Sequence, residues 1–333
     1  MRSPSESAFA PKADPIAYVA SALHDASRDW PQTNCYVDLW IEAIHARGLC
    51  PHAMLAFTAT LDFEGDQFTF FKPPLEDIEA LYGFSVRELS IYDDLAGHLV
   101  EQCARGRLVL IEVDAFHLPD TRGVSYGLES SKTTIGVNRI DPGGRVIDYF
   151  HNEAYFRAEG PDYDGVLAFG ADAGRLKLPP YAEILKADFA PLDDKAARDC
   201  ARRLLTRHLG RRPARNPIAA FAARLPDLVE RMSTREPEFF HKFAFNSLRQ
   251  LGANFELMGS HLAWLGDKDD FAAEIEACRA ISSGAKAFQF LLARATVRRK
   301  TVGLEAPLAV LSETYDRLFD GLTRRDRALR LAS

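Results

Sequence analysis

Several features that mark well-defined protein classes are missing from this sequence. No stretch approaches the ~18 uninterrupted apolar residues that a membrane-spanning helix needs, and the opening MRSPSESAFAPK lacks the apolar core of a secretory signal. Positive charge is not in surplus either, since the 333 residues carry a formal net charge of −6, whereas nucleic-acid-binding domains are usually basic. We therefore expect a cytoplasmic protein that binds neither membranes nor nucleic acid.

Cysteine is also scarce. The five cysteines are scattered, odd in number and never arranged as C-x-x-C, which indicates a reducing compartment and argues against a zinc knuckle. The chain contains no phosphate-binding G-x-x-x-x-G-K-[ST] loop, no G-x-G-x-x-G after a strand, no H-E-x-x-H and no calcium-binding loop. We expect neither a metal ion nor an organic cofactor.

One cysteine stands at the start of a predicted helix. The stretch WPQTNCYVDLWIEAIHARG places Cys35 just after residues that can cap a helix. The apolar face follows the spacing i, i+3, i+4 and i+7, with Val37, Trp40, Ile41 and Ile44. We expect Asp38, Glu42 and His45 on the opposite, polar side. In the first helical turn, unpaired N–H groups and the helix dipole favour thiolate over thiol, so Cys35 is a candidate nucleophile. The alternative is that it is a small buried packing residue, as most free cysteines are.

The rest of the chain divides into a mixed half and a helical half. We expect a loose terminus over 1–15, an α+β domain over 16–190 and a helical domain over 191–333. Within the α+β domain the expected elements are a short helix at 15–26, a hairpin at 55–72, helices at 75–82 and 95–105, strands at 86–91 and 108–113, a hairpin at 132–151 and an irregular region to about 173. The helical half has helix-forming sequence at 192–209, 217–232, 237–265, 268–299 with a weak point at 282–284, and 305–331.

A helix bearing an early cysteine, followed by an antiparallel sheet, is the order of elements in papain-like folds. Such a site needs a thiolate, an imidazole that moves the proton and a third group that orients the imidazole. The second strand of the central hairpin offers Asp148, and His151 follows at its end. His117 lies on the loop that leaves the preceding strand, where it is either functional or bonded to the nearby backbone.

The residues also carry a resemblance to a known family. The blocks NCYVDLWIEAIHARGL, DFEGDQFTFFK, RLVLIEVDAFHLPDT, KTTIGVNRID, DYFHNEAYF and LPPYAE resemble the uncharacterised bacterial family catalogued as domain of unknown function 1839, over roughly 15–330. That family is in turn distantly similar to the acyltransferase family of butirosin biosynthesis protein H. The distant similarity implies a papain-like domain followed by helices, and transfer of an acyl group from a carrier-protein thioester, through Cys35, to an amine.

The sequence departs from the acyltransferase pattern at the imidazole. A histidine is expected at the start of the central hairpin, where SYGLESSKTTIGV has Ser130, Ser131 and Lys132 instead. Either His151 or His117 enters the site from another element, with Asp148 as the orienting acid, or the site has lost its base.

Four further residues are candidates for substrate binding. Gln32 and Asn34 can donate to an oxyanion beside the Cys35 N–H, although both also suit helix capping. Asp114, beside His117, either orients that imidazole or makes a turn. Lys132 is the cation at the position of the missing histidine.

Three functions follow from these residues. The first is a cysteine-dependent acyl or aminoacyl transferase acting on a carrier protein, through its phosphopantetheine arm, and on a small amine. The second is a non-catalytic adaptor, a pseudoenzyme, that binds a carrier protein or its ligase. The third is a thiol amidohydrolase, which uses the same residues with water as acceptor.

Overall fold

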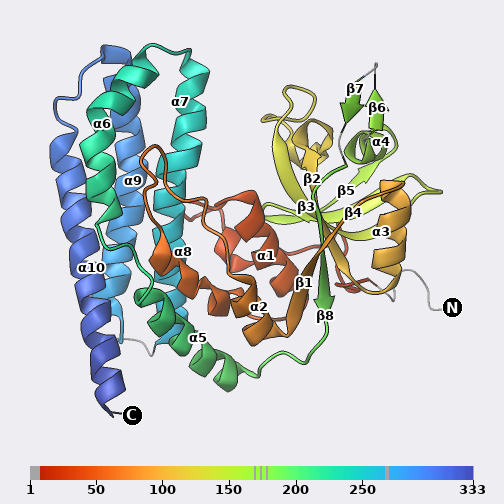
Figure 1. Ribbon diagram of the computed structural model, residues 1–333, viewed down its shortest axis with the longest axis horizontal. Coiled ribbons are helices and arrows are strands. Elements are labelled where there is room, and N and C mark those ends of the chain that lie inside the picture. The colour runs from red at the N-terminus through yellow and green to blue at the C-terminus, as the bar shows by residue number, and fades with distance from the viewer. Residues whose placement is uncertain (1–7, 169, 173–174, 178, 267–269, 333) are drawn as a thin grey trace. The chain divides into compact units, whose positions relative to one another are not determined.

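The computed structural model describes residues 8–168, 170–172, 175–177, 179–266 and 270–332. Two compact units are assembled from interleaved segments of the chain. The sheet unit contains the residues up to Asp25, Cys35–Pro51 and Ile78–Leu192. The helical unit contains Ala26–Asn34, His52–Asp77 and the chain from Asp193 onward. The prediction of an α+β region with an antiparallel sheet, followed by a helical region, is confirmed (Figure 1).

The sheet unit is built on six antiparallel strands in the order β1-β8-β2-β3-β4-β5. Their bounds are β1 Phe84–Leu89, β2 Leu108–Asp114, β3 Lys132–Asp141, β4 Val146–His151, β5 Ala154–Glu159 and β8 Ala182–Ala187. A separate two-stranded ribbon pairs β6 Gly170–Asp172 with β7 Arg175–Lys177. Strand β2 lies inside the sheet between β8 and β3, and its apolar run is buried, as the sequence predicts.

The central hairpin is confirmed, and it continues further than expected. A tight turn joins β3 to β4, with Arg145 at a positive φ of 53°. Beyond β4, the sequence predicts irregular structure to about residue 173. Instead β5 pairs with β4 along its whole length, and helix α4, Pro161–Leu167, follows. The prediction is wrong here because Tyr155 and Ala158 gain burial only through pairing with β4, which a local pattern does not reveal.

The two faces of this sheet are covered by different helices. Helix α1, Cys35–Ala46, packs on β3, β4 and β5, while α3, Leu95–Ala104, and α4 pack on the other face (Figure 1). Alternate strand residues therefore enter different cores. Ile135, Val137, Ile147 and Tyr149 join the α3–α4 core.

The N-terminal segment packs onto the sheet unit. Residues 1–7 lie outside the described residues, but Phe9 is fully buried and the Ala10 N–H donates to Asn138 of β3. This part of the terminus is therefore packed and not loose. The helix expected at 15–26 is reduced to the 3₁₀ turn η1, Ala22–His24, since Ser21 and His24 bond to α1 instead of to a helix of their own.

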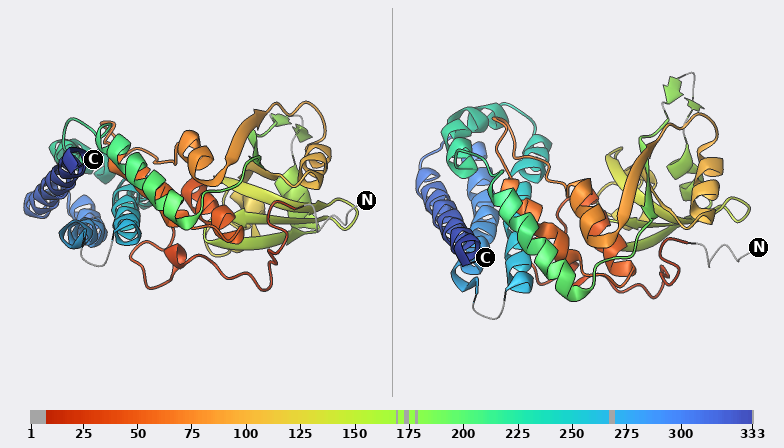
Figure 2. Two further views of the ribbon diagram at one scale, coloured as in Figure 1. Left: turned by 90° about the horizontal axis from the view of Figure 1, so that it is seen from below. Right: turned by 60° about the horizontal axis from the view of Figure 1, so that its bottom comes forward.

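The helical unit contains the elements predicted for the second half. Their bounds are α5 Asp194–Leu209, α6 Pro217–Ser233, α7 Pro237–Ala244, a π-helical turn η5 Phe245–Arg249, α8 Gln250–Leu265, α9 Ala272–Arg298 and α10 Glu305–Ala332. Helix α9 runs without a break through the weak point expected at 282–284, and α9 and α10 lie side by side (Figure 2). A Cβ on Gly284 would fall 2.4 Å from a methyl carbon of Leu311, so this glycine permits the close approach of α10.

The hairpin predicted at 55–72 is wrong. Residues Pro51–Thr60 form the 3₁₀ helix η2, and only an isolated bridge joins Phe63 to Phe68. Thr58 and Thr60 donate their hydroxyls to carbonyls three residues back, which satisfies the backbone locally. Apolar residues buried on every side of this short helix gave it the composition of a strand. Across the described residues, no helix combines the length and the apolar character needed to cross a membrane.

Candidate functional site

Cys35 is the first residue of α1, as the sequence predicts, and its side chain is half-buried. Helix α1 is nevertheless less amphipathic than expected. Asp38 and Glu42, predicted on an exposed polar side, are both fully buried, while His45 at the last turn is partly exposed. Buried carboxylates require partners, and the sheet unit supplies them.

The partner of both carboxylates is His24, from the turn η1. Its Nδ1 lies 2.5 Å from a Glu42 carboxylate oxygen and its Nε2 lies 3.3 Å from Asp38. Glu42 also accepts the Tyr18 hydroxyl at 2.5 Å and the Ser21 N–H at 3.0 Å. Burial alone would lower the pKa of His24, but hydrogen bonds and attraction from Asp38 and Glu42 outweigh it and raise the pKa to about 9. This is a buried imidazolium between two carboxylates.

His151 has a different partner from the one the sequence suggested. Its Nδ1 lies 2.6 Å from Asp120, and its Nε2 lies 2.7 Å from the Thr133 hydroxyl. The Tyr149 hydroxyl donates to the other Asp120 oxygen at 2.6 Å. Asp148 instead accepts two hydrogen bonds from Arg157, at 2.6 and 3.1 Å. The carboxylate that orients His151 is therefore that of Asp120.

Strand alternation explains why His151 is not brought to Cys35. His151 and Tyr149 are two residues apart on β4 and share Asp120, so both face the layer of α3 and α4. The α1 side of the same strand is marked by Phe150, whose ring contacts Tyr18, the residue bonded to Glu42. His151 thus lies across the sheet from the helix that begins at Cys35.

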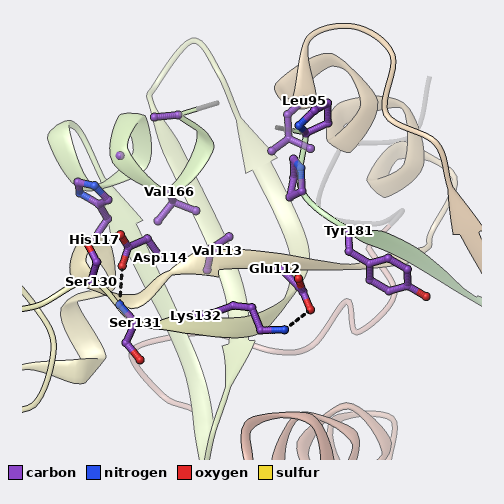
Figure 3. A pocket seen from close by; sticks show the side chains of 14 residues that line it. Leu95, Glu112, Val113, Asp114, His117, Ser130, Ser131, Lys132, Val166 and Tyr181 are labelled. Carbon is purple, nitrogen blue, oxygen red and sulfur yellow. Dashed lines mark hydrogen bonds and ion pairs between the residues drawn. The ribbon is translucent and has the colours of Figure 1, made fainter. Parts of the chain in front are cut away.

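Three of the predicted residues line one cleft at the end of β2 and β3. This cleft has a volume of about 500 Å³, and Figure 3 shows Asp114 and His117 at one end of it and Lys132 further along. Lys132 pairs with Glu112 at 2.6 Å. Burial would raise the pKa of Asp114, but N–H donors from the backbone and the Ser130 hydroxyl outweigh it, so the pKa is lowered.

The two candidate oxyanion donors belong to the helical unit. The Asn34 side-chain nitrogen donates to the Phe71 carbonyl at 3.1 Å and to the Gln250 side chain at 3.3 Å. Gln32 accepts hydrogen bonds from Arg249 at its backbone and side-chain oxygens. Both residues therefore have structural bonds of their own, and their role towards an oxyanion stays a prediction.

Three of the remaining four cysteines are buried and therefore less suited to chemistry than Cys35. Cys103 and Cys278 are buried, and burial raises the pKa of both thiols, that of Cys103 to about 12. Cys200 is also buried, whereas Cys50 is half-buried like Cys35. Within the part of the chain that the structure describes, no three His, Cys, Asp or Glu side chains are grouped so that they could hold a metal ion.

His24 and Asp120 were not predicted as site residues. His24 lies 18 positions before Glu42 and Asp120 lies 31 before His151, so neither pair produces a local pattern. The one available signal was the i, i+4 pair of Asp38 and Glu42 on a helix with an otherwise apolar surface, since such carboxylates need a buried cation.

Comparison with known families covers nearly the whole chain. A family model described as the DUF1839 N-terminal domain matches residues 19–187, and one described as the DUF1839 C-terminal domain matches residues 194–324. The resemblance of the sequence blocks to domain of unknown function 1839 is confirmed. No curated protein matches the sequence.

Proposed function

The chain belongs to the DUF1839 family, and from that premise we propose that it is a cysteine-dependent acyl or aminoacyl transferase with Cys35 as its nucleophile. One observation carries the proposal: a half-buried thiol occupies the first turn of a 12-residue helix laid on an antiparallel sheet. This is the placement of the nucleophile in papain-like enzymes, and the proposal extends to a papain-like character for the sheet unit.

The charges along α1 bear on the thiolate. The positive end of the helix favours it, whereas Asp38, three residues on and in the first turn, opposes it. The His24 imidazolium against Asp38 compensates for that carboxylate. His24 is therefore proposed as an electrostatic support for Cys35. It is not a proton acceptor, because at neutral pH it is already protonated.

The reaction proceeds in two steps. The Cys35 thiolate attacks the carbonyl carbon of the carrier thioester, and the carrier thiolate leaves and takes a proton from solvent. An amine then attacks the Cys35 thioester, the amide forms, Cys35 leaves as thiolate and the amine proton passes to solvent or to a second amine. Water as acceptor gives the hydrolase instead, so a reaction without amine separates these two enzymes.

Thiol alkylation is the first test. We expect iodoacetamide to modify Cys35 faster than the half-buried Cys50 at neutral pH, because the Cys35 thiol lies in the first turn of a helix, near its positive end. Peptide mass mapping reports each cysteine separately. Incubation with acyl-loaded carrier protein should then add the acyl mass to Cys35, and Cys35→Ser should abolish this while Cys50→Ser leaves it intact. Slow alkylation of Cys35 at every pH at which the protein stays folded would refute the proposal that Cys35 is the nucleophile.

A specific observation favours the second candidate, the non-catalytic adaptor. In the described part of the sheet unit, His151 and His117 lie with the α3–α4 layer and His24 is held between carboxylates. An adaptor binds the carrier protein through charge, so its affinity falls with salt and is unchanged by alkylation of Cys35. Salt-insensitive binding would argue against this function.

A further inference from the structure

The cleft of about 500 Å³ in the sheet unit has a volume in the range of small-molecule sites. Apolar side chains of Leu95, Val113 and Val166 line it, with Pro179 and Pro180 beside them. Polar groups gather at one end, so the lining combines an apolar wall with a few convergent polar atoms. Such a lining is typical of a site for an amphipathic ligand.

Asp114 supplies a fixed negative charge at the polar end. One of its carboxylate oxygens accepts the N–H groups of Phe116 and Ser131, both at 3.0 Å. Figure 3 shows the bond from Ser131. These bonds hold the carboxylate in place before any ligand arrives, and the same donors keep it ionised. Both of these hydrogen bonds end on the same oxygen, Oδ1, and the Ser130 hydroxyl is a further donor to the carboxylate.

His117 is positioned beside this carboxylate by a glycine. A Cβ on Gly165 of α4 would fall 2.2 Å from His117 Nδ1, a separation that no side chain can adopt. Glycine inside a helix lowers helix stability by about 1 kcal/mol relative to alanine. This less stable residue stands at the position where a larger one would collide with the imidazole. The ring also meets Phe116 edge-on, with centroids 5.0 Å apart. The imidazole is thus held against the α4 backbone at the mouth of the cleft.

The charge balance of the cleft selects the ligand. Two carboxylates, Glu112 and Asp114, line the cleft together with one lysine, Lys132, which pairs with Glu112. The carboxylates therefore outnumber the lysine, and Asp114 has the imidazole of His117 as its neighbour. The Asp114 carboxylate would repel an anion in the cleft, whereas it would attract a cation. We propose that the cleft binds a small molecule whose ammonium group contacts Asp114, with His117 as a second polar contact and an apolar body against Leu95, Val113 and Val166.

This site rests on the cleft alone and requires no acyl transfer by Cys35. Its test therefore measures binding. Three probes share one apolar body and differ in the head group: 4-phenylbutylamine, 4-phenylbutanol and 4-phenylbutyrate. We expect calorimetric titration of the full chain at neutral pH to give the tightest binding for the amine. The alcohol should bind at least tenfold more weakly, because a hydrogen bond to a charged group contributes more to binding than one between neutral groups, by about a factor of ten in affinity.

Two substitutions in the cleft locate the contact. Asp114→Asn removes the charge but keeps an oxygen for the Phe116 and Ser131 N–H groups, and it should weaken amine binding at least tenfold. Gly165→Ala should also weaken it, since the new Cβ displaces His117. The matched control is Glu129→Gln, which removes an exposed carboxylate next to Ser130 that does not line the cleft. Cys35→Ser should bind the amine like the unmodified protein.

The contrary outcomes are equally distinct. Binding of 4-phenylbutyrate as tight as that of the amine overturns the proposal, as does unchanged amine affinity in Asp114→Asn or the absence of heat with all three probes. None of these results bears on alkylation or acylation of Cys35, so the two proposals fail separately.

Discussion

Replacement of His24 by alanine is expected to lower the free energy of unfolding of the sheet unit by about 3–5 kcal/mol. The side chains of His24, Asp38 and Glu42 are all but inaccessible to solvent. Without the imidazolium, two buried carboxylates on successive turns of α1 lose the attraction of His24. Removal of one member of a buried ionic group leaves uncompensated charge, which costs far more than the intact group contributes.

The pH dependence provides an independent readout of the same cluster. The pKa of His24 is raised from 6.5 in the unfolded chain to about 9. Its contribution is therefore complete below pH 6.5 and is lost as the pH rises to 9, with a total on the order of 3 kcal/mol. The difference in stability between the unmodified protein and His24→Ala should narrow by this amount over that range.

Hydrogen exchange of peptides from α1 measures this effect within the sheet unit alone. The matched control is His45→Ala, at the partly exposed last turn of the same helix, which we expect to change stability by less than about 1 kcal/mol. Equal protection of α1 in His24→Ala and His45→Ala would show that the cluster is not a determinant of stability. A gap that widens between pH 6.5 and 9 would show that His24 is not the titrating cation.

The parts of the fold that the sequence predicts are those with local causes. The central hairpin follows from β-branched residues on both sides of an Asp-Pro-Gly-Gly turn. The side chains of Asp193 and Asn216 cap helices α5 and α6, and the predicted starts of both helices lie within two residues of the observed ones. The helix that begins at Cys35 has the same kind of local signal.

The parts that escaped prediction depend on contacts distant in sequence. Strand β5 forms by pairing with β4, and the first part of the 55–72 segment belongs to the 3₁₀ helix η2, whose residues are mostly buried. The site shows the same division. Cys35 was found from its helix, whereas the burial of Glu42 and the pairing of His151 with Asp120 are tertiary facts. A single sequence does not indicate which of these distant residues come into contact.

Acid is expected to destabilise the helical unit through three histidines that are buried without charge. Burial lowers the pKa of His52, His208 and His261 from 6.5 to about 4 in each case. Positive charge nearby adds to the effect, from Arg28 at His52 and from Arg207 at His208. The neutral rings are integrated into the fold: His208 Nε2 lies 2.6 Å from the fully buried Asp77, and His261 Nδ1 lies 2.8 Å from the His52 carbonyl oxygen.

The sign of the effect follows from proton binding. Between pH 6.5 and 4 the unfolded chain protonates these imidazoles and the folded chain does not, so the free energy of unfolding falls as the pH falls. Each histidine contributes a slope of about 1.4 kcal/mol per pH unit, or about 4 kcal/mol per unit for the three together near pH 5. The contribution is complete above pH 6.5 and is lost towards pH 4.

His208→Gln isolates one third of this slope. A glutamine amide can still donate to Asp77, but it does not titrate, so the variant should lose stability with acid less steeply than the unmodified protein by about 1.4 kcal/mol per pH unit near pH 5. Urea unfolding is measured at several pH values between 7 and ~4.5, a range in which the unfolded chain protonates these histidines. Hydrogen exchange of α8 peptides follows the unfolding of the helical unit. The slope of stability against pH is obtained in this way whatever the absolute stability of the variant. The matched control is His241→Gln in α7, at an exposed position, which should leave the slope unchanged. If His208→Gln has the slope of the unmodified protein, His208 is not a buried neutral imidazole, and the acid sensitivity of the helical unit must come from other groups, such as His52 and His261.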